Sequence, residues 1–583
     1  MKLYLYTFLI LINTGTLSSD YYEINIPTRV EEAGKKYLSA DFHSKDTNTA
    51  KPVILIQTPY NKIPYRILDI LPANSKKFGF QYDTDNYHFV IVDWRGFYAS
   101  KDAAINQYDR GLDGYDIVEW IAAQKWCNGK VGTCGGSALG MIQFQTARHR
   151  PPHLVCASPS IKDYLNQYSN YFYGGVFRKE HVESLEGLGF ISANIILKMP
   201  EYNTVWERLA DSSDYPEEFN VPMLLISGWF DHYPSDVIRA FHDIRQRSDV
   251  KFRNSHKLIF GPWTHGAVGD KKQGDLEFPE AEDISTEAVM RFFGYFLLGN
   301  KNNWEAEPVI RYFMMGDNKW ETCEDWYSLK KDNISLYLHP QGKLEFEPVP
   351  VTIKEVEPDT IVFNPKDPSP SVGGSRFNPF DANVISGPVD IRQPVESRSD
   401  YTAFETAVLE KDIRVTGSID IELFFASDRT DTDIAARLCD VYPDGRSIIL
   451  TQGIQRLRYR NSLKNAELIT PGQITSVKVT LEHLGHVFKA GHKLRIILTG
   501  SDYPMFDINL NNGGELYKPG DTLIARNLIY HDNSNRSRIV IPTDAPLAVL
   551  DENNFTDIGE LVINPNPARS EEHTSELQSR QVI

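Results

Sequence analysis

The sequence predicts two domains of different classes: an α/β domain with a mostly parallel sheet, followed by an all-β domain. With 583 residues, the chain is too long for a single hydrophobic core. Short apolar segments alternate with helical ones up to residue 160 and again over 220–308. Between them, residues 161–219 have apolar residues at helical spacing. Beyond residue 309, β-prone segments alternate with Pro, Gly, Asn and Asp turns.

The first residues predict a secretory signal peptide that precedes the fold. Met1-Lys2 are followed by an apolar run from Leu3 to Ile12 and then by small polar residues up to Ser19. This layout is typical of a cleavable signal, and the run is too short to span a bilayer. We therefore expect residues 1–19 to be removed and the protein to be exported, either to the periplasm or outside the cell. An ordinary N-terminal strand is the alternative.

The α/β domain is expected to contain several elements before residue 137. We expect strands at Val53–Ile56 and Phe89–Val92, a helix at Gly111–Ala123, and a strand at Val131–Cys134. The last strand leads directly into a glycine-rich turn.

This turn, in Val131-Gly-Thr-Cys-Gly-Gly-Ser137-Ala-Leu-Gly140, carries a serine. A helical pattern follows from Ala138 to Ala147, so the segment predicts a strand, a sharp turn and a helix. A serine at such an elbow exposes its Oγ to a base and to a substrate carbonyl. The usual motif is G-x-S-x-G, but here Leu139 precedes the second glycine, giving G-x-S-x-x-G. A plain glycine–serine turn is the alternative.

Two further polar residues follow apolar strands downstream. Asp231 ends the segment that begins at Val221, and His265 ends the one that begins at His256. Open α/β sheets place their sites at the carboxyl ends of their strands. The chain order Ser, Asp, His is that of the α/β-hydrolases. This order favours a nucleophilic site over the alternative of a helix cap and a solvated loop histidine.

Longer segments around these residues resemble a known family. They are Gln57–Lys62, Val92–Ser100, Trp126–Ser137, Gly228–Asp231, Gly261–His265, Tyr442–Arg446 and Phe488–Arg495. By these segments the chain resembles the CocE/NonD (cocaine-esterase-like) hydrolases of the X-Pro dipeptidyl-peptidase (peptidase S15) superfamily. The resemblance extends from about Ile54 to about Gly514.

The resemblance implies a role for each matching residue. Ser137 would be the nucleophile, His265 the general base that later protonates the leaving group, and Asp231 the carboxylate that orients the imidazole. In the family, the oxyanion hole uses a tyrosine hydroxyl and the backbone N–H that follows the nucleophile. The matching residues are Tyr60 and Ala138. The family often has an aromatic residue at position 138, but only its N–H is used.

The resemblance also implies the details of the fold. It predicts an α/β-hydrolase domain (residues 20–160 and 220–308) with an inserted helical cap (161–219). A C-terminal jelly-roll β-sandwich domain (309–565) would follow.

Aromatic side chains are expected to form the wall of the substrate pocket beside the serine. We select Tyr164, Tyr168 and Phe172 of the cap, together with Trp229. The alternative is that the cap aromatic residues only pack the cap onto the main domain.

Charge and motifs limit the partners. A net charge of −17 argues against nucleic acids and anionic membranes. No zinc spacing, EF-hand loop or dinucleotide fingerprint occurs, so we expect no cofactor and no metal.

Asp93 and Arg95 are expected to form an ion pair that holds a loop. The polar residues of the β domain are expected to be solvated or interdomain: Asp431, Asp433, Asp444, Arg446, His486 and His492.

We therefore expect a serine hydrolase that acts on a small-molecule ester, amide or short-peptide substrate through an acyl-enzyme. An esterase is the first hypothesis, and an X-Pro dipeptidyl-peptidase or an α-amino acid ester hydrolase or acylase is the alternative. The alternative activities need carboxylates for the substrate's ammonium group, and the candidates are Asp163, Glu180, Glu183 and Glu186. A non-catalytic carbohydrate-binding protein is a remote alternative. A homodimer stays an open question.

Two remaining features concern the cysteines and the last residues. Five cysteines leave at least one unpaired, which argues against a disulfide scaffold. Cys127 and Cys134 flank a short turn, but the predicted burial of Cys134 favours an inert thiol.

Residues 566–583 are expected to be a disordered tail. Part of it, Arg569–Ser579, resembles a translated sequencing adapter, so we suspect an assembly artefact.

Overall fold

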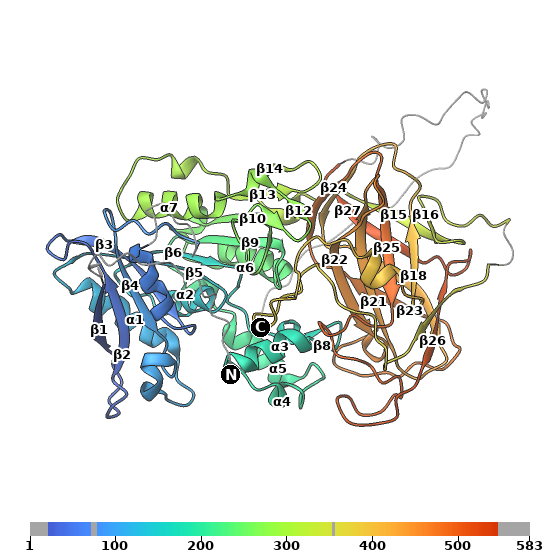
Figure 1. Cartoon of the computed structure of the whole chain (residues 1–583), viewed down its shortest axis with the longest axis horizontal. Coiled ribbons are helices and arrows are strands. Elements are labelled where there is room, and N and C mark those ends of the chain that lie inside the picture. The colour runs from blue at the N-terminus through green and yellow to red at the C-terminus, as the bar shows by residue number, and fades with distance from the viewer. Residues whose placement is uncertain (1–20, 71–78, 353–355, 546–583) are drawn as a thin grey trace, which may run out of the picture.

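The computed structural model of the chain describes residues 21–70, 79–352 and 356–545 (Figure 1). An N-terminal region, coloured blue to green, lies beside a C-terminal region of strands, coloured yellow to red. The predicted signal peptide (1–19) and tail (566–583) lie outside the described residues. Within the described ranges, no helix is both long and apolar enough to cross a membrane.

The N-terminal region is organised around one ten-stranded sheet. The seven central strands, β4, β3, β5, β6, β9, β10 and β13, run parallel to one another. The strands at the two edges, β1, β2 and β14, pair antiparallel with their neighbours. The strands β4, β9 and β10 are buried along their whole length, as expected of apolar strands covered on both faces. The strand order is β1 (Tyr21–Pro27), β2 (Tyr37–His43), β4 (His88–Asp93), β3 (Lys51–Thr58), β5 (Cys127–Gly136), β6 (Leu154–Ser160), β9 (Leu224–Phe230), β10 (Lys257–Thr264), β13 (Ile310–Met314) and β14 (Lys319–Cys323).

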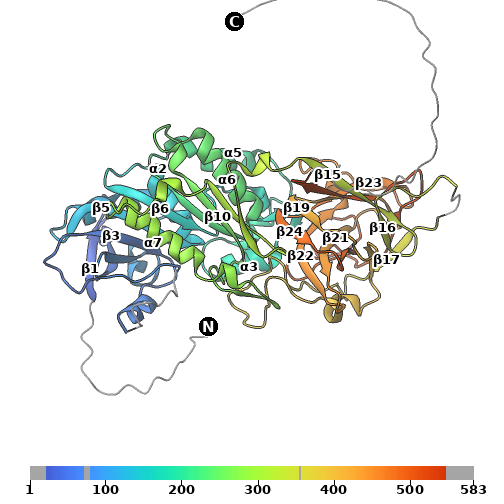
Figure 2. The same cartoon turned by 90° about the horizontal axis from the view of Figure 1, so that it is seen from above.

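Helices cover both faces of this sheet. In Figure 2, α2 and α6 lie on one side and α7 on the other. The carboxylate of Asp109 accepts a hydrogen bond from Gly111 N–H and so caps the first helix. The four helices are α1 (Arg110–Ala122), α2 (Ala138–Arg148), α6 (Pro234–Arg247) and α7 (Ile284–Phe296). The expected strands before Ser137 lie within β3, β4 and β5, and the expected helix matches α1 to within one residue.

The expected end of the α/β domain at residue 308 is wrong. The strand β13 pairs in parallel with β10, where Leu258 lies opposite Ile310, and β14 pairs with β13. Most of β13 is buried, so this apolar strand extends the parallel sheet. The sheet therefore continues to Cys323 before the chain enters the β-rich region.

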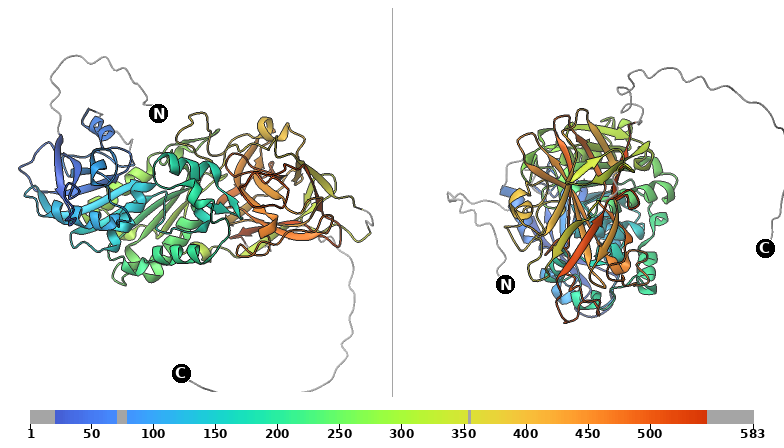
Figure 3. Two further views of the ribbon diagram at one scale, coloured as in Figure 1. Left: turned by 90° about the horizontal axis from the view of Figure 1, so that it is seen from below. Right: turned by 90° about the vertical axis from the view of Figure 1, so that its right-hand side faces the viewer.

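Residues 161–219 form a small subdomain between β6 and β9. It contains η3 (Tyr168–Asn170), the short strands β7 (Phe172–Tyr173) and β8 (Val176–Phe177), the helices α3 (Lys179–Gly187), α4 (Ala193–Ile196) and α5 (Thr204–Ser213), and η4 (Pro216–Glu218). Its helices lie at the junction of the two large regions in two views (Figures 1 and 3).

The C-terminal region consists mainly of one eleven-stranded sheet and one two-stranded sheet. Residues 413–427 hold two strands, and Gly417, with a φ of 141°, ends the first of them. The larger sheet holds β15 (Asp332–His339), β16 (Lys343–Glu345), β17 (Asp359–Phe363), β18 (Tyr401–Glu405), β20 (Asp420–Ser427), β21 (Asp433–Val441), β22 (Ser447–Arg456), β23 (Thr475–Thr480), β25 (Lys493–Thr499), β26 (Ala525–Tyr530) and β27 (Arg538–Thr543), and the smaller one holds β19 (Ile413–Gly417) and β24 (Leu484–Phe488).

The two regions are joined by backbone hydrogen bonds as well as by a continuous hydrophobic core. Met315 N–H donates to the carbonyl of Gly485 at 3.1 Å, and Val487 N–H donates to the carbonyl of Met315 at 2.8 Å. A side chain at Gly485 would collide with Trp229 of β9, so glycine allows this close approach. The junction is therefore a packed interface.

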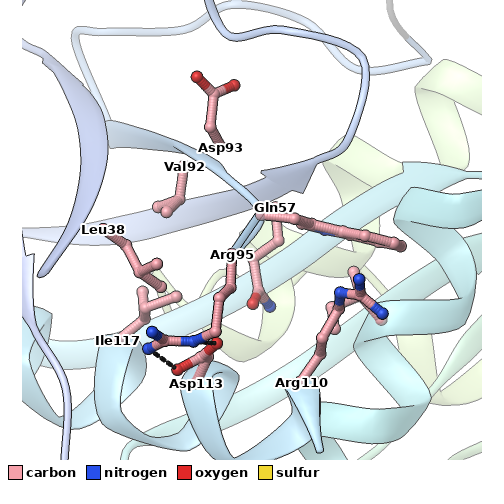
Figure 4. Close-up of a pocket in the computed structure, with 10 residues that line it drawn as sticks. Leu38, Gln57, Val92, Asp93, Arg95, Arg110, Asp113 and Ile117 are labelled. Atoms are coloured by element: carbon pink, nitrogen blue, oxygen red, sulfur yellow. Dashed lines mark hydrogen bonds and ion pairs between the residues drawn. The ribbon is translucent and has the colours of Figure 1, made fainter. Parts of the chain in front are cut away.

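The expected ion pair between Asp93 and Arg95 does not form (Figure 4). Arg95 instead donates to both carboxylate oxygens of Asp113 in α1, at 2.7 and 2.8 Å. Asp93 points away from it and accepts hydrogen bonds from the backbone N–H groups of Lys62 and Ala99. The cavity beside this pair is only about 10 Å³, the size of a single water, so it is no substrate site.

Candidate active site

Ser137 lies at a strained turn between β5 and α2. Its φ of 58° and ψ of −123° place it outside the regions that non-glycine residues usually adopt. Its backbone N–H donates to the carbonyl of Ser160 on the neighbouring strand β6. Strain of this kind persists only where the surrounding structure holds it, and it is common at active sites. The turn therefore has the elbow geometry that the sequence predicts.

The glycine pattern around the serine follows from close packing. A Cβ at Gly135 would lie 2.6 Å from the Cβ of Leu139, so the glycine makes room for the leucine of the variant motif. A Cβ at Gly140 would lie 2.8 Å from the carbonyl oxygen of Ser160. The helix can thus pass directly beside β6, and the G-x-S-x-x-G spacing still forms the elbow.

Asp231 and His265 follow two adjacent parallel strands, β9 and β10. His265 Nδ1 donates to Asp231 Oδ1 at 2.6 Å. The carboxylate is fully buried, and its second oxygen accepts a hydrogen bond from Ser227 Oγ at 3.4 Å. A buried carboxylate on Nδ1 fixes the ring orientation and leaves Nε2 for chemistry.

Tyr60 follows β3 and approaches the serine from the other side. Its hydroxyl donates to Ser137 Oγ at 3.4 Å. Burial raises the pKa of the phenol, while the Ser137 hydroxyl and the Ala138 backbone N–H nearby partly oppose the rise. The Tyr60 hydroxyl and the Ala138 N–H therefore lie next to each other beside Oγ. Two such donors can stabilise negative charge that develops on a substrate oxygen.

Ser137, Ala138, Tyr60 and His265 line one cavity of about 860 Å³, large enough for a drug-sized molecule. Within the described chain, no hydrogen bond joins Ser137 Oγ to His265. Such contacts are often long in ligand-free enzymes and shorten when a substrate binds.

Of the four aromatic residues selected for the pocket, only Tyr164 lines this cavity. Tyr168 and Phe172 stack on one another inside the 161–219 subdomain, with ring centroids 4.8 Å apart. The ring of Trp229 packs beside Gly485 of the C-terminal region, and its Nε1 donates to the carbonyl of Phe313 in β13. These three side chains are buried by packing and do not contact the cavity.

Among the ring-bearing residues of the cavity that the sequence analysis did not select are His181, His232 and Phe377. His232 follows Asp231 directly, a proximity that could have indicated it. His181 in α3 carries no comparable signal. Phe377 belongs to the C-terminal region, and its ring centroid lies 4.9 Å from that of His265. No local pattern could have identified that contact.

Residues 374–387, here called the strap, bring Phe377 to the cavity. Gly374 and Gly387 close the strap with two backbone hydrogen bonds. Arg376 donates to both oxygens of Glu180 in α3, at 2.7 and 2.9 Å. Glu180 is therefore bound to the strap.

The other carboxylates considered for binding an ammonium group are also occupied or remote. Asp163 pairs with Lys162 at 2.9 Å and accepts from Leu165 N–H. Glu186 accepts from Ala193 N–H, and Glu183 is exposed beside Lys179. None of these carboxylates lines the cavity.

The polar residues of the C-terminal region that the sequence analysis considered bond one another or other residues within that region. Asp431 pairs with Arg458, Asp433 with Arg456, Asp444 with Arg446, and His486 and His492 both with Asp440. Within the described residues, no group of three or more His, Cys, Asp or Glu side chains could hold a metal ion. All five cysteines, including Cys127 and Cys134, are free thiols.

Comparisons with known proteins agree with this architecture. Residues 44–195 and 190–267 match the X-Pro dipeptidyl-peptidase (S15 family) model, and residues 302–540 match the X-Pro dipeptidyl-peptidase C-terminal non-catalytic domain. The chain is 29% identical to cocaine esterase of Rhodococcus sp. over 87% of its own length and 96% of the relative's.

Solved structures show the same fold. An α-amino acid ester hydrolase superposes with a TM-score of 0.75 at 21% identity, covering 91% of this chain and 98% of the other. A CocE/NonD family hydrolase from Staphylococcus aureus superposes with a TM-score of 0.63 at 16% identity, covering 92% and 98%. The fold and the family matches together define a serine hydrolase. The two family models together match most of the chain, which therefore belongs to the X-Pro dipeptidyl-peptidase (peptidase S15) superfamily, and the chain is similar to the CocE/NonD hydrolases.

Proposed function

We propose that the protein is a carboxylic ester hydrolase that uses Ser137, His265 and Asp231 as a catalytic triad. The observation that carries the proposal is the 2.6 Å bond between Asp231 and His265, with His265 facing the same cavity as the strained Ser137. Tyr60 and Ala138 complete the site as the donors of the oxyanion hole.

The mechanism follows from these positions. Ser137 Oγ attacks the ester carbonyl while its proton passes to His265 Nε2, and the carbonyl oxygen becomes an oxyanion that Tyr60 and Ala138 stabilise. Collapse of the tetrahedral intermediate breaks the C–O bond, and the imidazolium gives its proton to the departing alcohol. Water then attacks the acyl-enzyme with His265 again as the base, which releases the acid and restores Ser137.

The charges of the cavity favour an ester over a substrate with a free amino terminus. An ammonium group next to the scissile carbonyl would need a carboxylate beside it, because burying an unpaired charge is unfavourable. Among the described residues of the cavity wall, Asp109 is the one carboxylate, whereas Arg148 and Lys162 contribute cations.

Asp109 lies far from Ser137. It caps α1 and bonds His149, which follows the C-terminus of α2. Ser137 precedes the N-terminus of the same helix, whose 11 residues span roughly 16 Å. The carboxylate of Asp109 therefore cannot hold an ammonium group beside the attacked carbonyl.

Two structural assignments accompany this function. We assign residues 161–219 as the cap of an α/β-hydrolase domain, because they line the cavity and contact the strap. We assign the C-terminal strands as a jelly roll, in agreement with the match to the C-terminal domain of X-Pro dipeptidyl-peptidases.

Two assays test the function. A fluorophosphonate probe should label the protein at Ser137, and the variant His265→Ala should lose the labelling. The protein should hydrolyse 4-nitrophenyl butyrate much faster than Gly-Pro-4-nitroanilide. Exclusive cleavage of the anilide would instead support the X-Pro dipeptidyl-peptidase, and absence of both labelling and hydrolysis would refute the triad.

A further inference from the structure

Two imidazoles beside His265 have no role in the hydrolysis described above. His232 directly follows Asp231, and His181 lies in α3; both line the active-site cavity. The ring centroid of His232 lies 4.8 Å from that of His265 and 4.6 Å from that of His181. The three rings therefore form a row that extends from His265 along the cavity wall.

The nitrogen atoms of this row are not all satisfied. Among the described residues, His232 has no hydrogen-bond partner at either ring nitrogen, and its Nδ1 is completely buried. The residue as a whole is only 6% exposed. His181 uses Nε2 to bond the Tyr233 hydroxyl at 2.6 Å and has no protein partner for Nδ1 in the same ranges. Because Nδ1 is completely buried, Nε2 is the nitrogen of His232 that a ligand in the cavity can reach, and it has no protein partner in the described residues. A polar atom without a partner in a cavity wall points to a ligand.

The charge state of the two rings limits what that ligand can be. Burial lowers the pKa of both His181 and His232 well below its usual value, and the positive charges nearby act in the same direction. Both rings are therefore neutral at neutral pH, and a neutral imidazole offers one N–H donor and one nitrogen acceptor. A hydroxyl group can bond Nε2 of His232 in either tautomer of the ring, because a hydroxyl both donates and accepts.

Charged ligand groups fit this place less well. Arg178 lies behind the row, where its guanidinium donates to the His232 carbonyl at 3.1 Å, and Lys162 contacts the Tyr233 ring. These two cations oppose an ammonium group beside the imidazoles. The Lys162 charge is itself paired with Asp163, so it offers no free partner for a carboxylate.

We propose that His232, with His181 behind it, forms a polar subsite that selects esters bearing a neutral hydroxyl group within a few bonds of the scissile carbonyl. The proposal rests on the esterase function proposed above and adds its substrate class. His232 is a positioning and specificity residue in this scheme and takes no part in bond making.

The test compares esters that differ by one hydroxyl group. The first pair is 4-nitrophenyl butyrate and 4-nitrophenyl 3-hydroxybutyrate, with the hydroxyl on the acyl side. The second pair is ethyl butyrate and 2-hydroxyethyl butyrate, with the hydroxyl on the alcohol side. The wild-type protein should show a kcat/KM about tenfold higher for the hydroxylated member of at least one pair, the value of one good hydrogen bond.

Variants then connect this preference to the imidazole. His232→Phe keeps a planar ring against Phe377 and His265 but removes both nitrogens, so the ratio within the preferred pair should fall to near one. His232→Asn keeps a donor and an acceptor and should retain part of the preference. His181→Phe provides the same comparison if His232→Phe does not fold, as judged by thermal melting and fluorophosphonate labelling.

Each outcome decides the proposal. A wild-type ratio near one in both pairs would overturn it. So would an equal loss on both members of a pair in His232→Phe, because that result would mean that His232 only supports His265 by packing. If the wild-type protein hydrolyses no ester and resists the fluorophosphonate, the esterase function itself fails, and the subsite fails with it. Loss of the hydroxyl preference in His232→Phe, in a variant that the fluorophosphonate still labels, would support the subsite.

Discussion

Buried aspartates occur in both large regions of the molecule, but their partners differ. In the C-terminal region, Asp433 receives two hydrogen bonds from Arg456, at 2.8 and 2.9 Å, and a third from Asn509. Near the serine, the fully buried Asp231 pairs with an imidazole whose opposite edge faces a cavity. The guanidinium of Arg456 is held by Asp433 across two neighbouring strands, whereas the imidazole of His265 bonds Asp231 through one nitrogen and lines a cavity. Burial of a carboxylate alone therefore does not indicate an active site. The informative feature is whether the partner of the carboxylate also faces a cavity.

The largest expected effect comes from breaking the imidazole pair. Asp231→Asn should lower kcat for 4-nitrophenyl butyrate by about 10⁴-fold, because an amide favours the wrong tautomer of His265. The melting temperature should change little, since an asparagine fits the same space. A kcat within tenfold of the wild-type value would contradict the role of Asp231. The Asp231–His265 pair would then differ in no functional way from the Asp433–Arg456 pair.

The matched change in the C-terminal region should act on stability. Asp433→Asn leaves the buried Arg456 charge without its counter-ion, which should cost about 3–5 kcal/mol of unfolding free energy. Urea unfolding measures this loss, and titration with a fluorophosphonate counts the sites that are still folded. The kcat per titrated site should stay at the wild-type value. A large fall in kcat per site with normal stability would show that the closed pair serves catalysis after all.

A smaller effect on rate is expected at the oxyanion hole. Tyr60→Phe removes one donor beside Ser137 and should lower kcat by about 10²-fold, or about 3 kcal/mol of barrier. Tyr312→Phe is the control, because it removes a buried hydroxyl that bonds Glu321 outside the cavity. Unchanged turnover in Tyr60→Phe would exclude this residue from the hole.

The smallest effect concerns the loss of stability at acidic pH. A buried imidazole can gain a proton in this range, whereas a guanidinium group is already charged. Burial, followed by the charge of Arg245, lowers the pKa of His256 to about 3 in the folded state, from an ordinary value of 6.5. The unfolded chain binds the proton first, so the contribution of His256 is complete above pH 6.5 and is lost as the pH falls from there toward 3.

His256→Asn should therefore flatten the loss of stability below pH 6.5 by up to about 1.4 kcal/mol per pH unit. Urea unfolding at pH 7 and pH 5 measures the difference. An unchanged slope would show that His256 does not resist protonation in the folded protein.

Much of the N-terminal region could be predicted from local patterns. Continuous apolar segments predict the buried parallel strands, because such strands are covered on both faces. The Gly135-Gly136-Ser137 sequence predicts the elbow, since its conformation depends on a few neighbouring residues. The positions of Asp231 and His265 at strand ends predict that they lie at one edge of a sheet, and adjacent strands bring them into contact.

The failures have a common physical cause. Aromatic character predicts burial but not the surface against which a ring packs, so Tyr168, Phe172 and Trp229 were assigned to the wrong surroundings. The oppositely charged residue nearest in sequence need not be the partner of a charge, as Arg95 shows by pairing with Asp113. The boundary at residue 308 failed because a strand can join a sheet formed much earlier in the chain.

By itself, the sequence determined the elements, the elbow and the order of the reacting groups, because backbone preferences and hydrophobic periodicity act over a few residues. The tertiary structure decided which groups share the cavity: the strap with Phe377, the pairing of Glu180 with Arg376, and the unpaired imidazole of His232. These contacts join segments far apart in the chain, where packing complementarity and charge compensation determine the neighbours. The cavity is therefore a property of the assembled domains, whereas the serine elbow is a property of ten consecutive residues.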